Sequence, residues 1–146
     1  MPKLVSLILM AGFASASILG FAQDTTPKIK MVPVQPTSPT SGQEMYSTYC
    51  AACHGVKATG NGPAAEALKT PPPNLTILSQ TNGGVFPADR VRTVLQFGVM
   101  TSAHGSAEMP VWGDLLRTLH STSPNTSMVV NQRILNLTNY IRQIQQ

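Results

Sequence analysis

The chain has 146 residues, of which 42% are hydrophobic and 11% are charged, and this length and composition indicate one globular domain and leave no room for several. Its formal net charge is +4, but the charged residues are scattered and form no basic run interleaved with aromatic side chains. A nucleic-acid-binding function is therefore not expected.

The first segment, residues 1–22, has the layout of a secretory signal peptide. Lys3 precedes an apolar run over residues 4–22 that ends in small residues, and cleavage is expected after Ala22. The same run is about long enough to span a bilayer, so an uncleaved membrane anchor is the alternative. Its serines and glycines weaken it as a permanent span and favour cleavage. We therefore expect a bacterial protein that is exported to the periplasm, with membrane attachment only if this segment is retained.

Residues 23–40 are rich in proline, threonine and serine. Such a composition is typical of an extended linker, because it offers few side chains that could form a core. The folded domain is accordingly predicted over residues 41–146, and we expect it to be a monomer.

Capping residues and apolar periodicity predict an all-α domain of three to five helices joined by long loops. Ser41 and Glu44 have the spacing of a capping box, which predicts a helix that starts here and runs towards Cys50. A second apolar repeat begins after Pro87 and ends at Gly98. The last helix is indicated by apolar residues that alternate steps of four and three, at Val130, Ile134, Leu137, Ile141 and Ile144.

Both cysteines of the chain lie in the sequence CAACH, residues 50–54, and three kinds of site could explain them. A thioredoxin-like dithiol belongs to an α/β fold, but no strand pattern precedes Cys50. A zinc site needs four ligands, and only His104 and His120 remain elsewhere to complete one. The C-x-x-C-H run fits the third kind, a c-type haem site, directly. Its two cysteines can form thioethers to the two vinyl groups of one porphyrin, and its histidine then binds iron, so haem is the preferred interpretation.

The domain resembles class I cytochromes c over about residues 41–144. Gly42 and Tyr46 match a glycine and an aromatic residue four positions later in the first helix of that family. Leu137 and Tyr140 match an aliphatic and an aromatic residue of the family's last helix, which crosses the first. The resemblance implies a small cytochrome c fold wrapped around one haem.

The resemblance also implies which residues hold the haem. One haem c would be bound covalently through Cys50 and Cys53, with His54 as an axial ligand of its iron. The P-N-L sequence that begins at Pro73 is similar to a segment of the family, so the carbonyl of Pro73 would accept the Nδ1 proton of His54. Leu75 would then line the haem. The stretch between the motif and Pro73 is longer than in compact members, and its alanines and leucine predict a short extra helix.

The second axial ligand is expected in the loop that follows the second predicted helix. The Met-Pro pair at Met109 matches a pair of the family, which implies Met109 as the ligand. His104 and Met100 lie in the same loop and are the alternatives. Trp112 is expected either near the haem edge or simply in the core.

With His54 and Met109 both on iron, no coordination position would remain for a substrate. The resemblance therefore implies a periplasmic one-electron carrier rather than an enzyme. Its partners would be redox proteins that make small, transient contacts near the haem edge. Two alternatives stay open, because one fold can serve several functions. One is a haem subunit tethered to a larger dehydrogenase or oxidase complex, and the other is a five-coordinate haem that binds gases or reduces peroxide.

Overall fold

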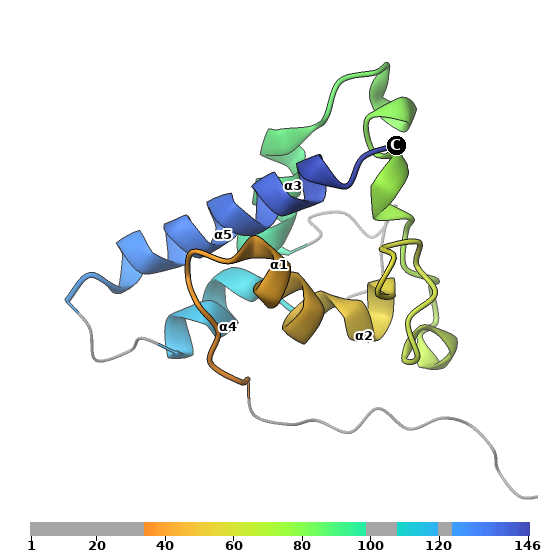
Figure 1. Cartoon of the computed structure of the whole chain (residues 1–146). Coiled ribbons are helices and arrows are strands. Elements are labelled where there is room, and N and C mark those ends of the chain that lie inside the picture. The colour runs from red at the N-terminus through yellow and green to blue at the C-terminus, as the bar shows by residue number, and fades with distance from the viewer. Residues whose placement is uncertain (1–33, 99–107, 120–123) are drawn as a thin grey trace, which may run out of the picture.

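The computed structural model describes residues 34–98, 108–119 and 124–146, and these residues are helical with no strand among them. Met100, His104 and His120 lie outside the described residues. The prediction of an all-α fold with long loops is confirmed (Figure 1). The elements are α1 (Gly42–Met45), a π-helical segment (Tyr46–Cys50), α2 (Ala51–His54), α3 (Ala88–Phe97), α4 (Trp112–Thr118) and α5 (Thr126–Gln143), with 3-10 turns at Ala65–Ala67, Leu75–Ile77 and Gln80–Asn82.

The first helix is one continuous rod made of α1, the π-helical segment and α2. It starts as predicted, because the hydroxyl of Ser41 accepts a hydrogen bond of 3.1 Å from the backbone N–H of Glu44. The carboxylate of Glu44 does not complete the capping box and accepts from the N–H of Ser38 at 3.2 Å instead. Within the rod, the N–H of Ala51 bonds the carbonyl of Tyr46, five residues earlier, which is the wider π-helical turn.

The rod crosses α5 at Gly42 (Figure 1). A Cβ atom at Gly42 would lie 2.8 Å from the Cβ of Tyr140 and would overlap the carbonyl oxygen of Asn136. One turn further along the rod, the rings of Tyr46 and Tyr140 pack with their centroids 5.4 Å apart. The two backbones can therefore meet only because this position carries no side chain.

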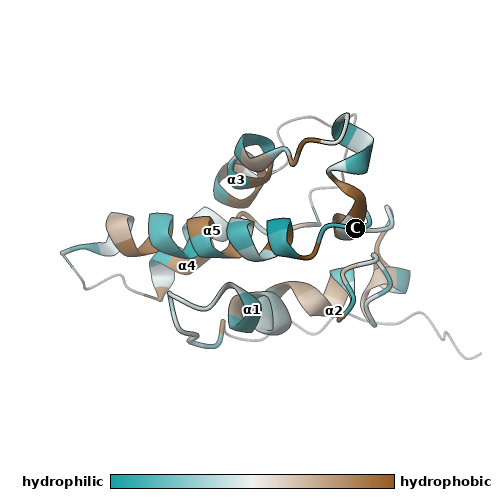
Figure 2. Cartoon of the chain, turned by 45° about the horizontal axis from the view of Figure 1, so that its top comes forward, coloured by the Kyte–Doolittle hydropathy of each residue, from teal (hydrophilic) through white to brown (hydrophobic). Residues whose placement is uncertain are grey.

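The core forms along α5, whose residues alternate between apolar and polar (Figure 2). Four of the five predicted positions are buried, and Ile144 lies just past the helix end and is half-buried. α3 and α4 pack on α5 and on each other, and their buried side chains Leu95 and Leu116 belong to the core. Gly98, with a φ of +80°, ends α3 as predicted. No helix in the described part of the chain is long and apolar enough to cross a membrane.

The two residues at the end of the chain, past α5, hold the last residue of the P-N-L sequence and the segment after it. The side-chain N–H of Gln145 donates to the carbonyl of Leu75 at 2.7 Å, and its side-chain oxygen accepts from the N–H of Ser79 at 2.9 Å. The N–H of Gln146 donates to the carbonyl of Thr76 at 2.9 Å. The last helix and the residues that follow it therefore contact the chain on both sides of the CAACH sequence.

Replacing Gly42 with alanine should destabilise the folded protein by about 1–3 kcal/mol, because the new methyl group must push α5 away. Helix propensity alone would give the opposite sign, since alanine is favoured over glycine by about 1 kcal/mol. Denaturant unfolding measures the change, and Gln43→Ala, at the exposed neighbouring position, is the control. Equal stability of Gly42→Ala and the parent would contradict the close crossing.

Candidate functional site

The CAACH sequence forms the end of the first helix. The side chain of Cys50 is buried, Cys53 is half-buried, and both thiols are free. Residues three positions apart lie on the same side of a helix, so the two cysteines face one region. His54 is the last residue of α2 and is also buried. The helix therefore presents two thiols and one imidazole together at its C-terminal end.

A loop closes over this helix end. Gly55 turns the chain with a φ of +80°. The backbone N–H groups of Gly60, Gly62 and Ala64 then donate to the carbonyls of residues 54, 53 and 52, at 2.8, 3.0 and 2.9 Å respectively. These bonds satisfy carbonyl groups that the helix itself leaves unpaired. The loop is thus fixed to the backbone of the motif, and the predicted short helix follows it as a 3-10 turn, Ala65–Ala67.

The same loop positions the P-N-L segment. The N–H of Leu75 donates to the carbonyl of Ala58 at 2.8 Å, and the side-chain oxygen of Asn74 accepts from the N–H of Thr76 at 2.9 Å. As a result, the carbonyl oxygen of Pro73 lies 3.3 Å from Nδ1 of His54. The contact implied by the resemblance is present in the structure. Leu75 itself is half-buried and packs against the core.

The surroundings of His54 favour a neutral imidazole. Burial lowers its pKa, and the hydrogen bond to the carbonyl of Pro73 opposes this shift. Since a carbonyl can only accept, the ring nitrogen that faces it, Nδ1, carries the proton. The lone pair of the neutral ring is then on Nε2, which is the form that binds a metal ion.

The two thiols are held in their protonated form at neutral pH. Burial raises the pKa of Cys50 to about 12, and the neighbouring Cys53 adds to this shift. Burial also raises the pKa of Cys53, and the negative charge of Glu108 adds to it. The second effect requires Glu108 to lie near the motif, although 54 residues separate it from His54 in the sequence.

Met109 follows Glu108 in a segment that is attached at both ends. At one end, the carboxylate of Glu108 accepts from the backbone N–H of Lys69 at 2.9 and 3.2 Å. At the other end, the ring of Trp112 stacks on the ring of Tyr49, with centroids 5.2 Å apart. Trp112 is buried, and Met109 is half-buried and packs against the core. The segment with the expected second ligand therefore lies against the helix that carries the motif.

Sequence reasoning missed several residues that build this site. Asn74 and Ala58 hold the P-N-L segment, and Tyr49 supports Trp112. The spacing of Gly55, Gly60 and Gly62 directly after the motif was the available signal for a tight loop there. No comparable local signal marks Tyr49, because its partner is distant in sequence.

The donors at this site suit a haem better than a bare metal ion. Within residues 34–98, 108–119 and 124–146, no group of three or more His, Cys, Asp or Glu side chains could hold a metal ion. The motif instead offers two free thiols and one imidazole with its Nδ1 engaged. A haem brings four nitrogen ligands of its own, so it needs from the protein only thiols for thioether bonds and axial ligands.

One family of known proteins matches the chain. The family described as "Cytochrome C oxidase, cbb3-type, subunit III" matches residues 37–118. This match covers more than half of the chain, so the chain belongs to that family of c-type cytochrome domains, which implies a haem c and a role in electron transfer. Comparisons with curated proteins and with solved structures give no match.

A buried tyrosine next to the motif gives a pH-dependent prediction. The hydroxyl of Tyr46 donates to the carbonyl of Gly55 at 2.7 Å, and burial, followed by the charges of Cys50 and Tyr140, raises its pKa from 10.0 to about 12. Its contribution to stability is therefore fully present below pH 10 and is lost as the pH rises towards 12. Tyr46→Phe should cost about 1 kcal/mol at neutral pH, and this difference from the parent should shrink between pH 10 and 12.

Denaturant unfolding of the two haem-loaded proteins at several pH values measures this difference, because burial, the largest cause of the raised pKa, does not depend on a free thiol at Cys50. Tyr49→Phe is the control, because it also removes a tyrosine hydroxyl, which bonds the carbonyl of Gln35 and is not among the groups that shift the pKa of Tyr46. A difference between Tyr46→Phe and the parent that stays constant up to pH 12 would contradict the raised pKa.

Proposed function

We propose that this member of the family is an electron-transfer protein with one haem c, bound through Cys50 and Cys53 and ligated by His54 and Met109. The observation that carries the proposal is the contact of 3.3 Å between Nδ1 of His54 and the carbonyl of Pro73. This contact lies directly beside two free thiols. It orients the imidazole with Nε2 available for iron, which is the arrangement that an axial histidine needs.

The residues of the chain have separate parts in this proposed function. A bound haem would supply reversible one-electron chemistry. The carbonyl of Pro73 holds the proton of His54 at Nδ1, and the half-buried Leu75 and buried Trp112 exclude water from the neighbourhood. His54 and Met109 would hold the iron, and a thioether ligand beside an imidazole ligand would favour the reduced state and so a high potential. With both residues bound to iron, no position would remain for a substrate.

The proposal includes an exported location and redox proteins as partners. The signal-like residues 1–22 and the proline-rich residues 23–40 support export, with the haem domain as a monomer at the end of a linker. If the apolar residues 4–22 are retained, the linker would keep the domain near a membrane.

A second candidate function is a subunit of an oxidase complex. The family description favours it, since it names a subunit of a cbb3-type cytochrome c oxidase. In this case the same haem domain would pass electrons within a stable assembly. The chemistry of the site is the same in both cases, and only the partner differs.

Replacing Met109 with alanine should remove the methionine–iron charge-transfer band from the ferric visible spectrum and leave the haem covalently attached. The control is Met128→Ala, because Met128 is 70% exposed on α5 and should leave the spectrum unchanged. The protein is expressed for export with haem-maturation factors, and both oxidation states are recorded. A high-spin parent without the band would overturn the carrier function and favour a haem that binds gases or reduces peroxide.

Association with a complex can be tested separately from the spectrum. The tagged full chain is expressed in its own host, the membranes are solubilised in mild detergent, and the haem protein is followed by size-exclusion chromatography. A free carrier should elute at the size of the monomer, which is 15.6 kDa before any processing. Co-elution with oxidase activity at high mass would instead support the second candidate.

A further inference from the structure

Residues 35–39, which we call the strap, are tied to α5 by a buried arginine. Nη1 of Arg133 donates to the hydroxyl oxygen of Thr37 at 2.8 Å, and Nη2 donates to the carbonyl of Thr37 at 2.6 Å. Arg133 is 1% exposed and Thr37 is 9% exposed. The side-chain amide of Asn136 also donates to the carbonyl of Pro39 at 2.9 Å. The strap, at the orange start of the trace in Figure 1, is therefore part of the packed domain although its composition is typical of a linker.

The strap in turn holds Tyr49, the residue before the first cysteine of the motif. The hydroxyl of Tyr49 donates to the carbonyl of Gln35 at 2.5 Å and lies 2.8 Å from the hydroxyl of Thr37. The hydroxyl of Thr37 accepts from Arg133, so its own proton is available to Tyr49. The four groups thus form one ordered chain of hydrogen bonds, in which each bond strengthens the next.

Tyr49 transmits this anchoring to the segment with Met109. Its ring stacks on Trp112 at an interplanar angle of 27°. Trp112 is the first residue of α4, and no side chain caps that helix start. The next residue, Gly113, lies against the carbonyl of Gln96 at the end of α3, with no room for a Cβ atom. The start of α4, three residues after Met109, is therefore positioned by the aromatic stack on one side and by α3 on the other.

We propose that the strap is a positioning device which, through Tyr49 and Trp112, keeps Met109 on the haem iron. This inference rests on the proposed ligation by Met109. The strap holds the hydroxyl of Tyr49, at the far end of the ring that stacks on Trp112. Loosening the strap should therefore allow Met109 to leave the iron while the domain remains folded.

The test uses the full haem-loaded chain with Thr37→Val and Tyr49→Phe, which remove hydroxyls and keep the shape and the aromatic stack. Ferric protein is titrated with imidazole, which occupies the iron only when methionine has left, and loss of the methionine–iron band is followed. Removing a hydrogen bond of ordinary strength should lower the imidazole midpoint about three- to tenfold in each variant. The double variant should shift by less than the sum of the two single shifts, because both changes break the bond between Thr37 and Tyr49.

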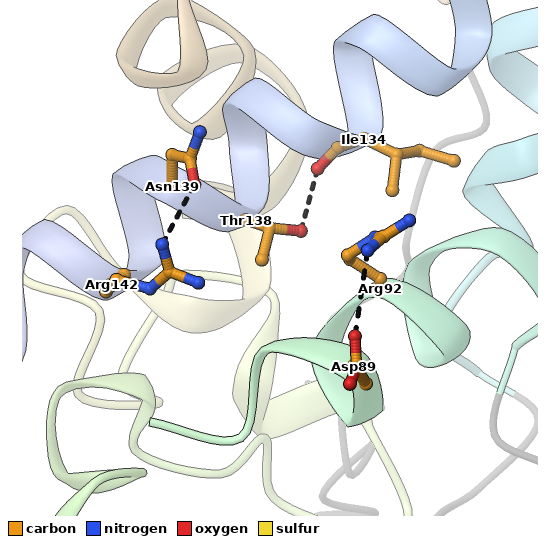
Figure 3. Close-up of polar contacts among 6 residues, drawn as sticks. All are labelled: Asp89, Arg92, Ile134, Thr138, Asn139 and Arg142. Atoms are coloured by element: carbon orange, nitrogen blue, oxygen red, sulfur yellow. Dashed lines mark hydrogen bonds and ion pairs between the residues drawn. The ribbon is translucent and has the colours of Figure 1, made fainter. Parts of the chain in front are cut away.

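A matched control separates positioning from general destabilisation. Thr138→Val also removes a buried hydroxyl, which donates to the carbonyl of Ile134 at 2.7 Å within α5 (Figure 3). Its imidazole midpoint should equal that of the parent. Thr37→Ser, which keeps the hydroxyl, should restore the parent midpoint.

The possible results distinguish the inference from the proposed function. If the parent shows the methionine band and the strap variants titrate like Thr138→Val, the inference is overturned and the electron-transfer function stands. If the parent shows no band, the ligation by Met109 fails, and the inference fails with it. If Thr37→Val does not load haem, Tyr49→Phe alone decides, because it changes only one oxygen atom.

Discussion

The close contact between Gly42 and α5 is the constraint on which the site depends. The first helix and α5 approach until backbone and Cβ atoms touch, and no side chain fits between them. This crossing fixes one end of a rod whose other end carries Cys50, Cys53 and His54. Gln145, two residues past the end of α5, bonds Leu75 of the P-N-L segment and Ser79 after it. The last helix and the residues that follow it therefore hold both the motif and the segment that orients its histidine.

Signals that are local in the sequence predicted much of this fold. The apolar repeat of α5, the glycine end of α3 and the serine start of α1 each depend on residues within one or two helical turns. The chemical identity of the CAACH motif is similarly local, because its residues are adjacent. The crossing with α5 was predicted only because Gly42 and Tyr46 match residues in the first helix of the cytochrome c family. No local pattern in the sequence could have predicted it.

The rest could not be predicted because it depends on partners that are distant in sequence. In the sequence, Arg133 resembles any polar residue of an amphipathic helix. In the structure its guanidinium is buried and donates to Thr37, 96 positions earlier in the chain. The composition of the strap predicted a linker, because composition indicates how much of a core a segment can form by itself. It does not indicate which residues elsewhere in the domain form hydrogen bonds with the segment. Ala58 has a positive φ of 59°, a conformation that its side chain does not favour, and only the surrounding hydrogen bonds explain it.

The π-helical segment Tyr46–Cys50 lies between the crossing and the motif, so it affects the direction in which the side chains of the motif face. One wide turn accommodates an extra residue, and each residue of an α-helix advances the side chains by about 100°. The direction in which the thiols and imidazole face, relative to α5, is therefore determined by this wide turn. If the same residues formed a regular α-helix instead, the motif would be rotated by about 100° relative to the crossing and would turn away from Pro73. The wide turn between Gly42 and the motif is thus as much a part of the site as the residues that bind the cofactor.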